Sequence, residues 1–477
     1  MTLKSAGRPP KGIGRAFLAI AGAILIGRLA FAFAFPIAQI SDYASYFEGA
    51  QILAGLKEGT LGSWWPIGPK LLYAIPVSVF GADVRVLGVT NAFLFVLGVF
   101  FLYRGACLAF DGATATLAAL ISLVSLSDLF FNNLAGTEVL AGLSLNLVFY
   151  LVARSSSPRN LAVLGAVIGF AAYNRSNMVV MGAAVLVVEW FRTRHVGAAV
   201  RRTALVQVVA VMAMLPLCGY NFSQFGRFTP VTSNSGMQAW YGNNPDAGPG
   251  SHAYARLPEE FPQGSKQRLE LAAAYRSFFP QAGEGPLLTG ADPYAFPDLG
   301  MRYALAWIRH NPSRYAEFSM ARIRQMYEQC TYGVAPYLFY DPSLAEQPPW
   351  PDDLHSLLLG KGAHIRKADG PPNPRSPLIR FVGRLYQVLV AGAALGFLGT
   401  LIHVGLTRSK PERLLPGLLV LIYTAPFVLT IALNRYHVPA MGLLWTYLAH
   451  GLVQSLRLFG KGASLLPTPG PATGAHV

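Results

Sequence analysis

The stretch VLGVTNAFLFVLGVFFLYR, residues 86–104, decides the fold class. Its first 18 residues include no charged side chain, and Arg104 follows them directly. A helix that crosses a bilayer needs about 20 mostly apolar residues, and basic residues collect at the cytoplasmic ends of such helices. The stretch therefore predicts a transmembrane helix that ends at the cytoplasmic face.

Nine other stretches have the same apolar character. The composition agrees, because 53% of the 477 residues are hydrophobic and 13% are charged, whereas soluble domains carry roughly 25% charged residues. The sequence therefore predicts an all-α polytopic membrane protein with about ten transmembrane helices. The predicted spans are residues 16–36, 86–103, 113–131, 138–153, 160–174, 177–191, 203–220, 379–402, 414–433 and 438–456.

Basic residues predict how these helices are oriented. With the N-terminus in the cytoplasm, every predicted cytoplasmic segment carries Lys or Arg, as the positive-inside rule requires. The same orientation places the loop 38–85 and the long segment 221–376 outside. The cytoplasmic segments contain the basic residues Lys4, Arg8, Lys11, Arg15, Arg104, Arg154, Arg159, Arg192, Arg194, Arg201, Arg202, Arg408, Lys410, Arg413, Arg457 and Lys461.

The net charge of +15 belongs to the membrane part of the chain. The segment 221–376 has 14 basic and 14 acidic residues, and the remainder has 24 basic and 9 acidic residues. A nucleic-acid-binding domain would present a basic face, so nucleic acid is not an expected partner. The three cysteines, Cys107, Cys218 and Cys330, are far apart in the chain, which predicts neither a zinc site nor a disulfide framework.

The hydrophobic pattern divides the chain into four parts. Residues 1–220 form a transmembrane module that includes the first external loop, and residues 221–376 form an external domain of mixed fold. Residues 377–456 are C-terminal transmembrane helices. Residues 457–477 end in a Pro/Gly/Ala-rich stretch, which predicts a disordered cytoplasmic tail.

Two features stand out in the external domain. Asn311 and Pro312 are typical of a helix start, and the apolar face of that helix would lie either on the membrane surface or on a domain core. Trp240 and Tyr241 precede Asn243 and Asn244 in a polar and aromatic turn. This turn would suit either a sugar or the docking of the domain on the membrane part, and the second interpretation is slightly favoured.

Several motifs occur in a particular order along this topology. The first external loop contains SDYASYFEGAQILAG (41–55) and WPIGPKLLYAIPVSVFG (65–81). Later stretches read GTEVLAGLSLNLVFYLVAR (136–154), FGRFTPVTSNSGMQAWYGNNPDAGPG (225–250) and NRYHVPAMGLLWTYLAHGL (434–452). Together they resemble the GT-C superfamily of membrane glycosyltransferases, which includes protein O-mannosyltransferases and the bacterial enzymes that modify lipid A. The resemblance runs through most of residues 16–456.

The resemblance implies a glycosyltransferase of a bacterial inner membrane. Such an enzyme takes a sugar from a polyprenyl-phosphate donor at the periplasmic face and transfers it, with inversion, to a hydroxyl of a glycan, lipid or protein. The reaction needs a general base for the acceptor hydroxyl and cations that stabilise the departing phosphate. No cofactor is predicted, and a divalent metal stays open. The family often has two adjacent acids in the first loop, whereas here Tyr43 follows Asp42, so no metal ligands are assigned.

Three acids are candidates for catalysis. Asp42 is the first acid after the opening span, and it matches the position of the family's catalytic carboxylate, although it would also suit a helix N-cap. Glu48 lies six residues further on, so it would line the same cavity or face solvent. Glu138 begins a membrane helix, where an acid is costly and often functional but also interacts favourably with the helix dipole.

Cations and aromatic residues near the outer ends of the spans are candidates for donor binding. Arg435 leads because arginine binds phosphate with two parallel hydrogen bonds, although an interfacial Arg-Tyr anchor is the alternative. Arg175, between two short spans, has similar surroundings in the sequence. The other candidates are Tyr436, His437, Lys70 and Arg85, and Lys57 more weakly.

Two rival functions fit the same topology. The first is a transporter or flippase for a lipid-linked sugar, which would place charges at the middle of the bilayer and show paired repeats. Here most external charges lie at the ends of spans, and Arg28 is the exception. The second rival is an acceptor-binding subunit that has lost its activity.

Overall fold

The residues that the computed structural model describes form helices and include no strand. This confirms the predicted class of an all-α, multi-pass membrane protein. The described residues are 11–34, 39, 41–125, 129, 131–154, 156–230, 232, 234–244, 247–248, 295–327, 377–407, 410–430 and 434–463.

The helices follow the predicted order of spans. The first part of the chain contains α1 (Lys11–Ala34), α2 (Ser41–Leu53), α3 (Ile67–Phe80), α4 (Val84–Ala109), α5 (Gly112–Leu123), η1 (Phe131–Asn133), α7 (Glu138–Arg154), α8 (Pro158–Asn174), η2 (Ser176–Met181), α9 (Gly182–Thr193) and α10 (Val196–Phe225). The remainder contains α11 (Ser235–Gly242), α13 (Ala295–His310), α14 (Pro312–Met326), α17 (Pro377–Thr407), η3 (Pro411–Leu414), α18 (Leu415–Leu429), η4 (Asn434–Ala440) and α19 (Met441–Ala463).

Five helices of the described chain are long and apolar enough to cross a membrane, so the predicted count of ten is not confirmed. They are Phe17–Ala34, Val84–Ala109, Val196–Phe225, Arg384–Thr407 and Pro411–Leu429.

Two expected boundaries differ from the structure. The predicted span 113–131 contains α5, which ends at Leu123 after 12 residues. At a rise of 1.5 Å per residue this helix is about 18 Å long, which is short of the roughly 30 Å hydrocarbon core. The predicted tail 457–477 begins too early, because α19 continues to Ala463. Residues 464–477 lie outside the described part.

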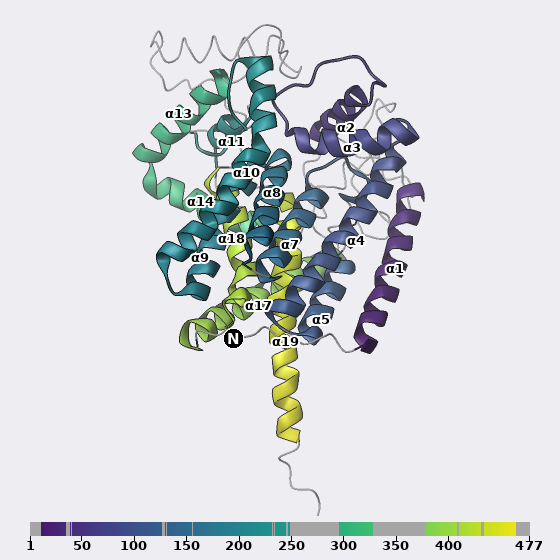
Figure 1. Ribbon diagram of the computed structural model, residues 1–477, viewed down its shortest axis with the longest axis vertical. Helices are drawn as coiled ribbons and strands as arrows, with labels where there is room; N and C mark the ends of the chain where they lie inside the picture. Colours follow the sequence, from purple (N-terminus) through teal and green to yellow (C-terminus); the bar gives the residue numbers. More distant parts are fainter. Residues whose placement is uncertain are drawn as a thin grey trace, which may run out of the picture.

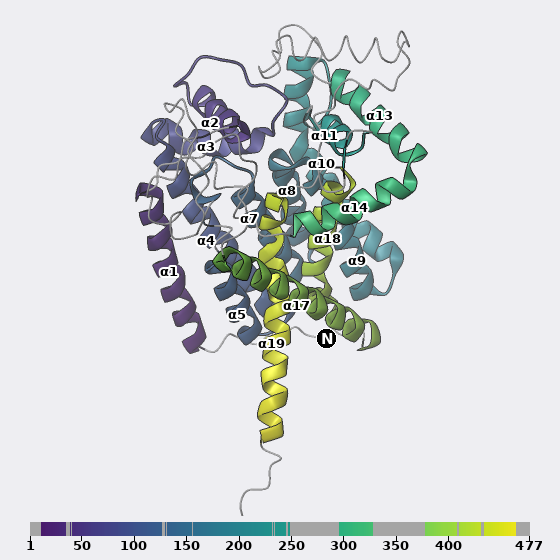
Figure 2. The ribbon, with the colours of Figure 1, turned by 180° about the vertical axis from the view of Figure 1, so that it is seen from behind.

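The long helices lie roughly along the long axis of the molecule, and α2, α3 and α11 gather at the upper end in Figure 1. The helix α17 crosses obliquely over α19 in Figure 2, and these two helices are in contact. Close packing relies on small residues: a Cβ atom on Gly165 or Gly169 of α8 would lie 2.5 or 2.6 Å from a backbone oxygen of α10. This spacing of two glycines lets helix backbones approach closely in membranes.

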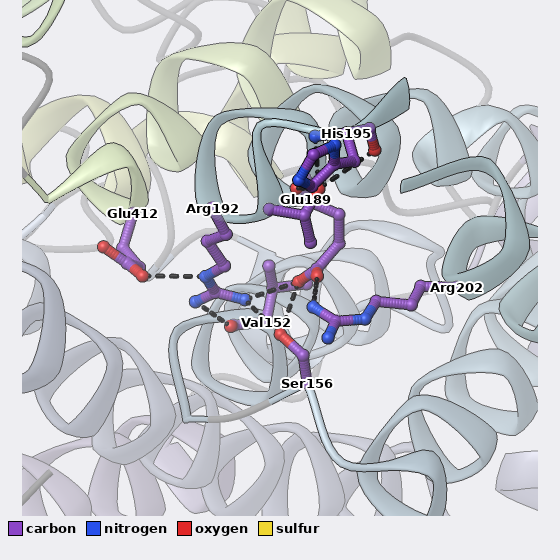
Figure 3. A network of polar contacts seen from close by, with 8 residues as sticks. Val152, Ser156, Glu189, Arg192, His195, Arg202 and Glu412 are labelled. Carbon is purple, nitrogen blue, oxygen red and sulfur yellow. Dashed lines mark hydrogen bonds and ion pairs between the residues drawn. The ribbon is translucent and has the colours of Figure 1, made fainter. Parts of the chain in front are cut away.

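A network of ion pairs joins the helix ends that the sequence places in the cytoplasm. Figure 3 shows the Glu189 carboxylate between Arg192 and Arg202, each 2.7 Å away. Ser156 donates a hydrogen bond of 2.6 Å to the same carboxylate. Arg192 also pairs with Glu412 of η3 at 2.7 Å, so the network ties α7, α9 and α10 to the C-terminal helices.

The helices α11 and α14 dock on the end of α18 through a buried arginine. Arg322 of α14 donates hydrogen bonds to Asn243 Oδ1 at 3.1 Å, to the Val428 carbonyl at 3.2 Å and to the Gly242 carbonyl. Asn243 in turn donates to the Leu429 carbonyl at 3.1 Å. The structure therefore supports the docking interpretation of the Asn243–Asn244 turn. The apolar Phe318 of α14 stacks on Trp307, so that helix packs on a small core.

Candidate active site

The helices surround a cavity of about 260 Å³ at the end of the molecule that holds α2, α3 and α11. Its lining comes from the start of α2, the residues before α3, the start of α7, the residues after α8 and the segment 232–238. Met301 of α13, the end of α18 and Tyr436 of η4 complete it. Segments far apart in the sequence therefore meet at one polar site.

Glu138 and Arg175 form a buried ion pair at this cavity. Glu138 is the first residue of α7 and is 3% exposed, and Arg175 directly follows α8. Arg175 Nη2 lies 3.1 Å from Glu138 Oε1 and donates a hydrogen bond of 2.6 Å to Thr137 Oγ1. Glu138 Oε2 has no hydrogen-bond partner among the described residues. This oxygen packs beside Gly136, where a Cβ atom would lie 2.3 Å from it.

Aromatic rings surround the Arg175 guanidinium. Its central carbon lies 5.3 Å from the ring centre of Tyr436, 5.5 Å from that of Phe427 and 6.0 Å from that of Tyr423. Tyr436 itself stacks on Phe427 with 4.5 Å between ring centres. Cation–π attraction adds to the ion pair, so the guanidinium is held firmly beside the cavity.

Asp42 reaches the same cavity from α2. It lies in the first turn of that helix, which begins at Ser41, and it is 6% exposed. A carboxylate in the first helical turn interacts favourably with the helix dipole. The structure thus brings together four of the residues predicted for the site: Asp42, Glu138, Arg175 and Tyr436.

A set of buried polar side chains holds the backbone that leads into Glu138. Asn91 of α4 donates hydrogen bonds of 2.9 Å to the carbonyls of Asn132 and Leu134. Tyr73 of α3 donates to Asn91 Oδ1 at 2.9 Å and to the Gly136 carbonyl at 3.1 Å. Neither residue is among those predicted for the site from the sequence. The feature of the sequence that indicates Asn91 is its amide within an otherwise apolar span, where polar groups are costly.

Two predicted residues lie away from the cavity lining. Glu48 is half exposed and pairs with Lys57 at 2.6 Å. Arg85 is also half exposed and lies 3.7 Å from Asp83. Both side chains form half-exposed ion pairs within residues 38–85, so the structure does not bring them to the site.

Lys70 of α3 is buried against the segment that joins α2 to α3. Its ammonium donates a hydrogen bond of 3.2 Å to the Gly62 carbonyl, and its stem fills the space beside Gly49. Burial lowers the pKa of Lys70 from 10.5 to about 8, and Glu48 partly opposes this shift. Its ammonium is therefore positioned by the loop and does not belong to the cavity lining.

The two remaining candidates belong to η4. His437 is fully buried, shares a hydrogen bond with the Tyr386 hydroxyl and packs 5.7 Å from the Tyr327 ring. The Arg435 backbone lies in η4, but its side chain is outside the described part of the structure. Among the described residues, no group of three or more His, Cys, Asp or Glu side chains would hold a metal ion.

Comparison with known proteins supports the predicted resemblance. Residues 65–219 match the family model described as dolichyl-phosphate-mannose-protein mannosyltransferase. The match covers three of the elements that line the cavity, namely the residues before α3, the start of α7 and the residues after α8. It confirms the resemblance to GT-C glycosyltransferases. No curated protein matches the chain significantly.

Solved structures of two GT-C glycosyltransferases are similar to this chain. The oligosaccharyltransferase AglB from Archaeoglobus fulgidus, with an inhibitory peptide and a dolichol-phosphate, is 13% identical at a TM-score of 0.46. That alignment covers 96% of this chain and 52% of AglB, so the chain spans about half of AglB's length. ArnT from Cupriavidus metallidurans, bound to undecaprenyl phosphate, is 15% identical at a TM-score of 0.42, with 96% and 81% covered.

Proposed function

We propose that this protein is a glycosyltransferase that moves a sugar from a polyprenyl-phosphate donor to an acceptor hydroxyl at the periplasmic face of a bacterial inner membrane. The observation that carries the proposal is the convergence of Asp42, Glu138, Arg175 and Tyr436 on one cavity. The family match supports the donor class, because dolichyl phosphate is itself a polyprenyl phosphate.

Asp42 is the proposed general base. Its carboxylate takes the proton of the acceptor hydroxyl while the acceptor oxygen forms a bond to the anomeric carbon of the sugar. The bond between that carbon and the phosphate oxygen breaks, and the electron pair leaves with the polyprenyl phosphate. A direct displacement of this kind inverts the anomeric centre, and the base contributes typically 10²–10⁴-fold to the rate.

Arg175 is the proposed contact for the leaving phosphate. Its guanidinium lies beside the cavity and has donors enough to bind Glu138, Thr137 and a phosphate oxygen together. Charge stabilisation of a leaving group is often the largest single contribution to catalysis. Glu138 then acts as a positioning residue, because it fixes the guanidinium through the 3.1 Å ion pair.

The location of the cavity supports a periplasmic reaction. The Glu189 network joins helix ends that carry the basic residues of the predicted cytoplasmic segments, such as Arg192 and Arg202. The cavity lies at the other end of the molecule, with α2 and α11. By the positive-inside rule, that end faces away from the cytoplasm.

The test is a turnover assay with the purified protein in proteoliposomes. A polyprenyl-phosphate sugar with a labelled sugar is supplied together with candidate glycan, lipid and protein acceptors. We expect the label to appear on an acceptor and free polyprenyl phosphate to accumulate in equal amount.

The rival functions give different results in the same assay. A flippase would move the intact donor across the bilayer without releasing polyprenyl phosphate. An inactive acceptor-binding subunit would bind an acceptor without either event. Within the described structure, Arg28 is 3% exposed and stacks 3.5 Å from the Phe95 ring centre, so the one deep charge that favoured a transporter is engaged in packing between α1 and α4.

A further inference from the structure

One wall of the cavity consists of neutral polar side chains. Thr232, Asn234, Ser235 and Gln238 line the cavity from the segment between α10 and α11 and from α11 itself. None of them carries a charge. The charged residues of the described lining, Asp42, Glu138 and Arg175, come from α2, α7 and the end of α8.

This wall, which we call the 232–238 wall, is fixed in place by its own contacts. The Thr232 hydroxyl donates to Asn234 Oδ1 at 2.8 Å, and the Ser235 hydroxyl donates to the Thr232 carbonyl at 3.2 Å. Gly236 packs so closely on the Pro297 carbonyl of α13 that a Cβ atom would lie 1.8 Å from that oxygen. The wall is thus held between α10 and α13 before any ligand binds.

Gln238 has unused hydrogen-bonding capacity. Its side chain lines the cavity, and its Oε1 atom is buried without a hydrogen-bond partner among the described residues. A buried polar atom without a partner is costly, so a rotation of the amide that lets Oε1 accept a hydrogen bond from a bound group would relieve that cost. A sugar hydroxyl both donates and accepts hydrogen bonds, and a side-chain amide can accept from it through oxygen and donate to it through nitrogen.

We propose that the 232–238 wall binds the hydroxyl groups of the transferred sugar, with Gln238 as the specificity-determining residue, and that this sugar is neutral. The inference rests on the proposed function. The charged groups of the lining are engaged otherwise, since Asp42 takes the acceptor proton and Glu138 pairs with Arg175. The described residues of the wall offer no ionic partner, so an ammonium or carboxylate on the sugar would lose its hydration there without compensation, which is unfavourable.

Two aromatic side chains of the lining suit the same ligand. Trp65 and Tyr46 line the cavity, with their ring centres 6.1 Å apart and their planes at 63°. Aromatic planes pack well on the C–H face of a pyranose or furanose, while amides and hydroxyls bind its edge. A sugar that contacts both Trp65 and the 232–238 wall would lie within the same cavity as Asp42.

The experiment compares three donors that share one polyprenyl phosphate and carry a neutral hexose, an amino sugar or a uronic acid. The wild-type protein should transfer the neutral sugar with the highest kcat/KM. Gln238→Leu should lower kcat/KM for the neutral donor by roughly tenfold, and Gln238→Glu should shift the preference toward the amino sugar by a similar factor. Gln51→Leu, on α2 and outside the lining, is the matched control and should change neither.

Several outcomes would overturn the inference. A wild-type preference for the amino sugar or the uronic acid would leave the proposed transferase function intact and show that the wall does not select a neutral sugar. An unchanged donor preference and kcat/KM in both Gln238 variants would show that this side chain does not contact the sugar. Absence of transfer from every donor, with an acceptor supplied, would refute the proposed function and this inference with it.

Discussion

Two variants at the ion pair between Arg175 and Glu138 separate the structural role of Arg175 from its proposed role in catalysis. Arg175→Met leaves the Glu138 carboxylate buried without its cation, removes the 2.6 Å bond to Thr137 and ends three ring contacts. Loss of one partner of a buried ion pair typically costs about 3–5 kcal/mol. We therefore expect Arg175→Met to fold poorly and to have no activity.

The double variant Arg175→Met/Glu138→Gln should recover most of that stability. The uncompensated charge is gone, methionine fills much of the space between the rings, and the remaining loss is the hydrogen bond to Thr137, worth about 1–2 kcal/mol. If Arg175 contacts the donor phosphate, the double variant is folded and still inactive. Tm in lipid nanodiscs and the turnover assay measure the two properties separately. Recovery of activity together with stability would contradict a phosphate contact and reduce Arg175 to a structural partner of Glu138.

Other predictions test the fold, the electrostatics and the topology. Glu189→Gln should destabilise the protein by about 2–4 kcal/mol, because two arginines lose a buried carboxylate. Glu412→Gln should destabilise it by about 1 kcal/mol or less, because only Arg192 loses a partner. Equal changes in Tm for the two variants would contradict the central place of Glu189 in the network of Figure 3. The folded pKa of Lys70, about 8, is below its unfolded value of 10.5, so the unfolded chain binds more protons between these values and stability rises with pH there. Thermal unfolding from pH 7.5 to 10.5 should show wild type gaining stability relative to Lys70→Met, and parallel curves would refute this. Reporter fusions should indicate a cytoplasmic location at Arg194 and an external location at Gly250. An external location at Arg194 would show that the predicted topology is wrong.

The sequence predicts the fold class and four of the residues that line the cavity. Apolar stretches such as 86–103 and the basic loops between them reflect the bilayer itself, so the order of the helices followed directly. Asp42, Glu138 and Arg175 were identifiable because charged residues at the outer ends of spans are costly and therefore informative. Their convergence on one cavity in the structure agrees with the predicted outer face.

Other features depend on packing that no single stretch encodes. Glu48 lies close to Asp42 in the chain, but six residues along a helix correspond to a rotation of about 240°. It therefore projects from another face of α2, where it pairs with Lys57. Tyr73 and Asn91 position the segment before Glu138 through hydrogen bonds to backbone carbonyls, and those partners are set by tertiary structure. The position of the 232–238 wall depends on two tertiary contacts: Arg322 ties α11 and α14 to the end of α18, and Gly236 lets α11 pack closely on α13.

The central claim is that Asp42 is the base of a polyprenyl-phosphate-dependent transfer reaction. Asp42→Asn preserves the shape and most hydrogen bonds of the side chain but removes its ability to take a proton at neutral pH. The decisive measurement is the turnover of this variant with a polyprenyl-phosphate sugar, together with donor binding by the same preparation. The account predicts a loss of about 10²–10⁴-fold in kcat with donor binding retained. Near-normal transfer by Asp42→Asn would contradict it and would leave Glu138 as the remaining carboxylate of the described cavity lining.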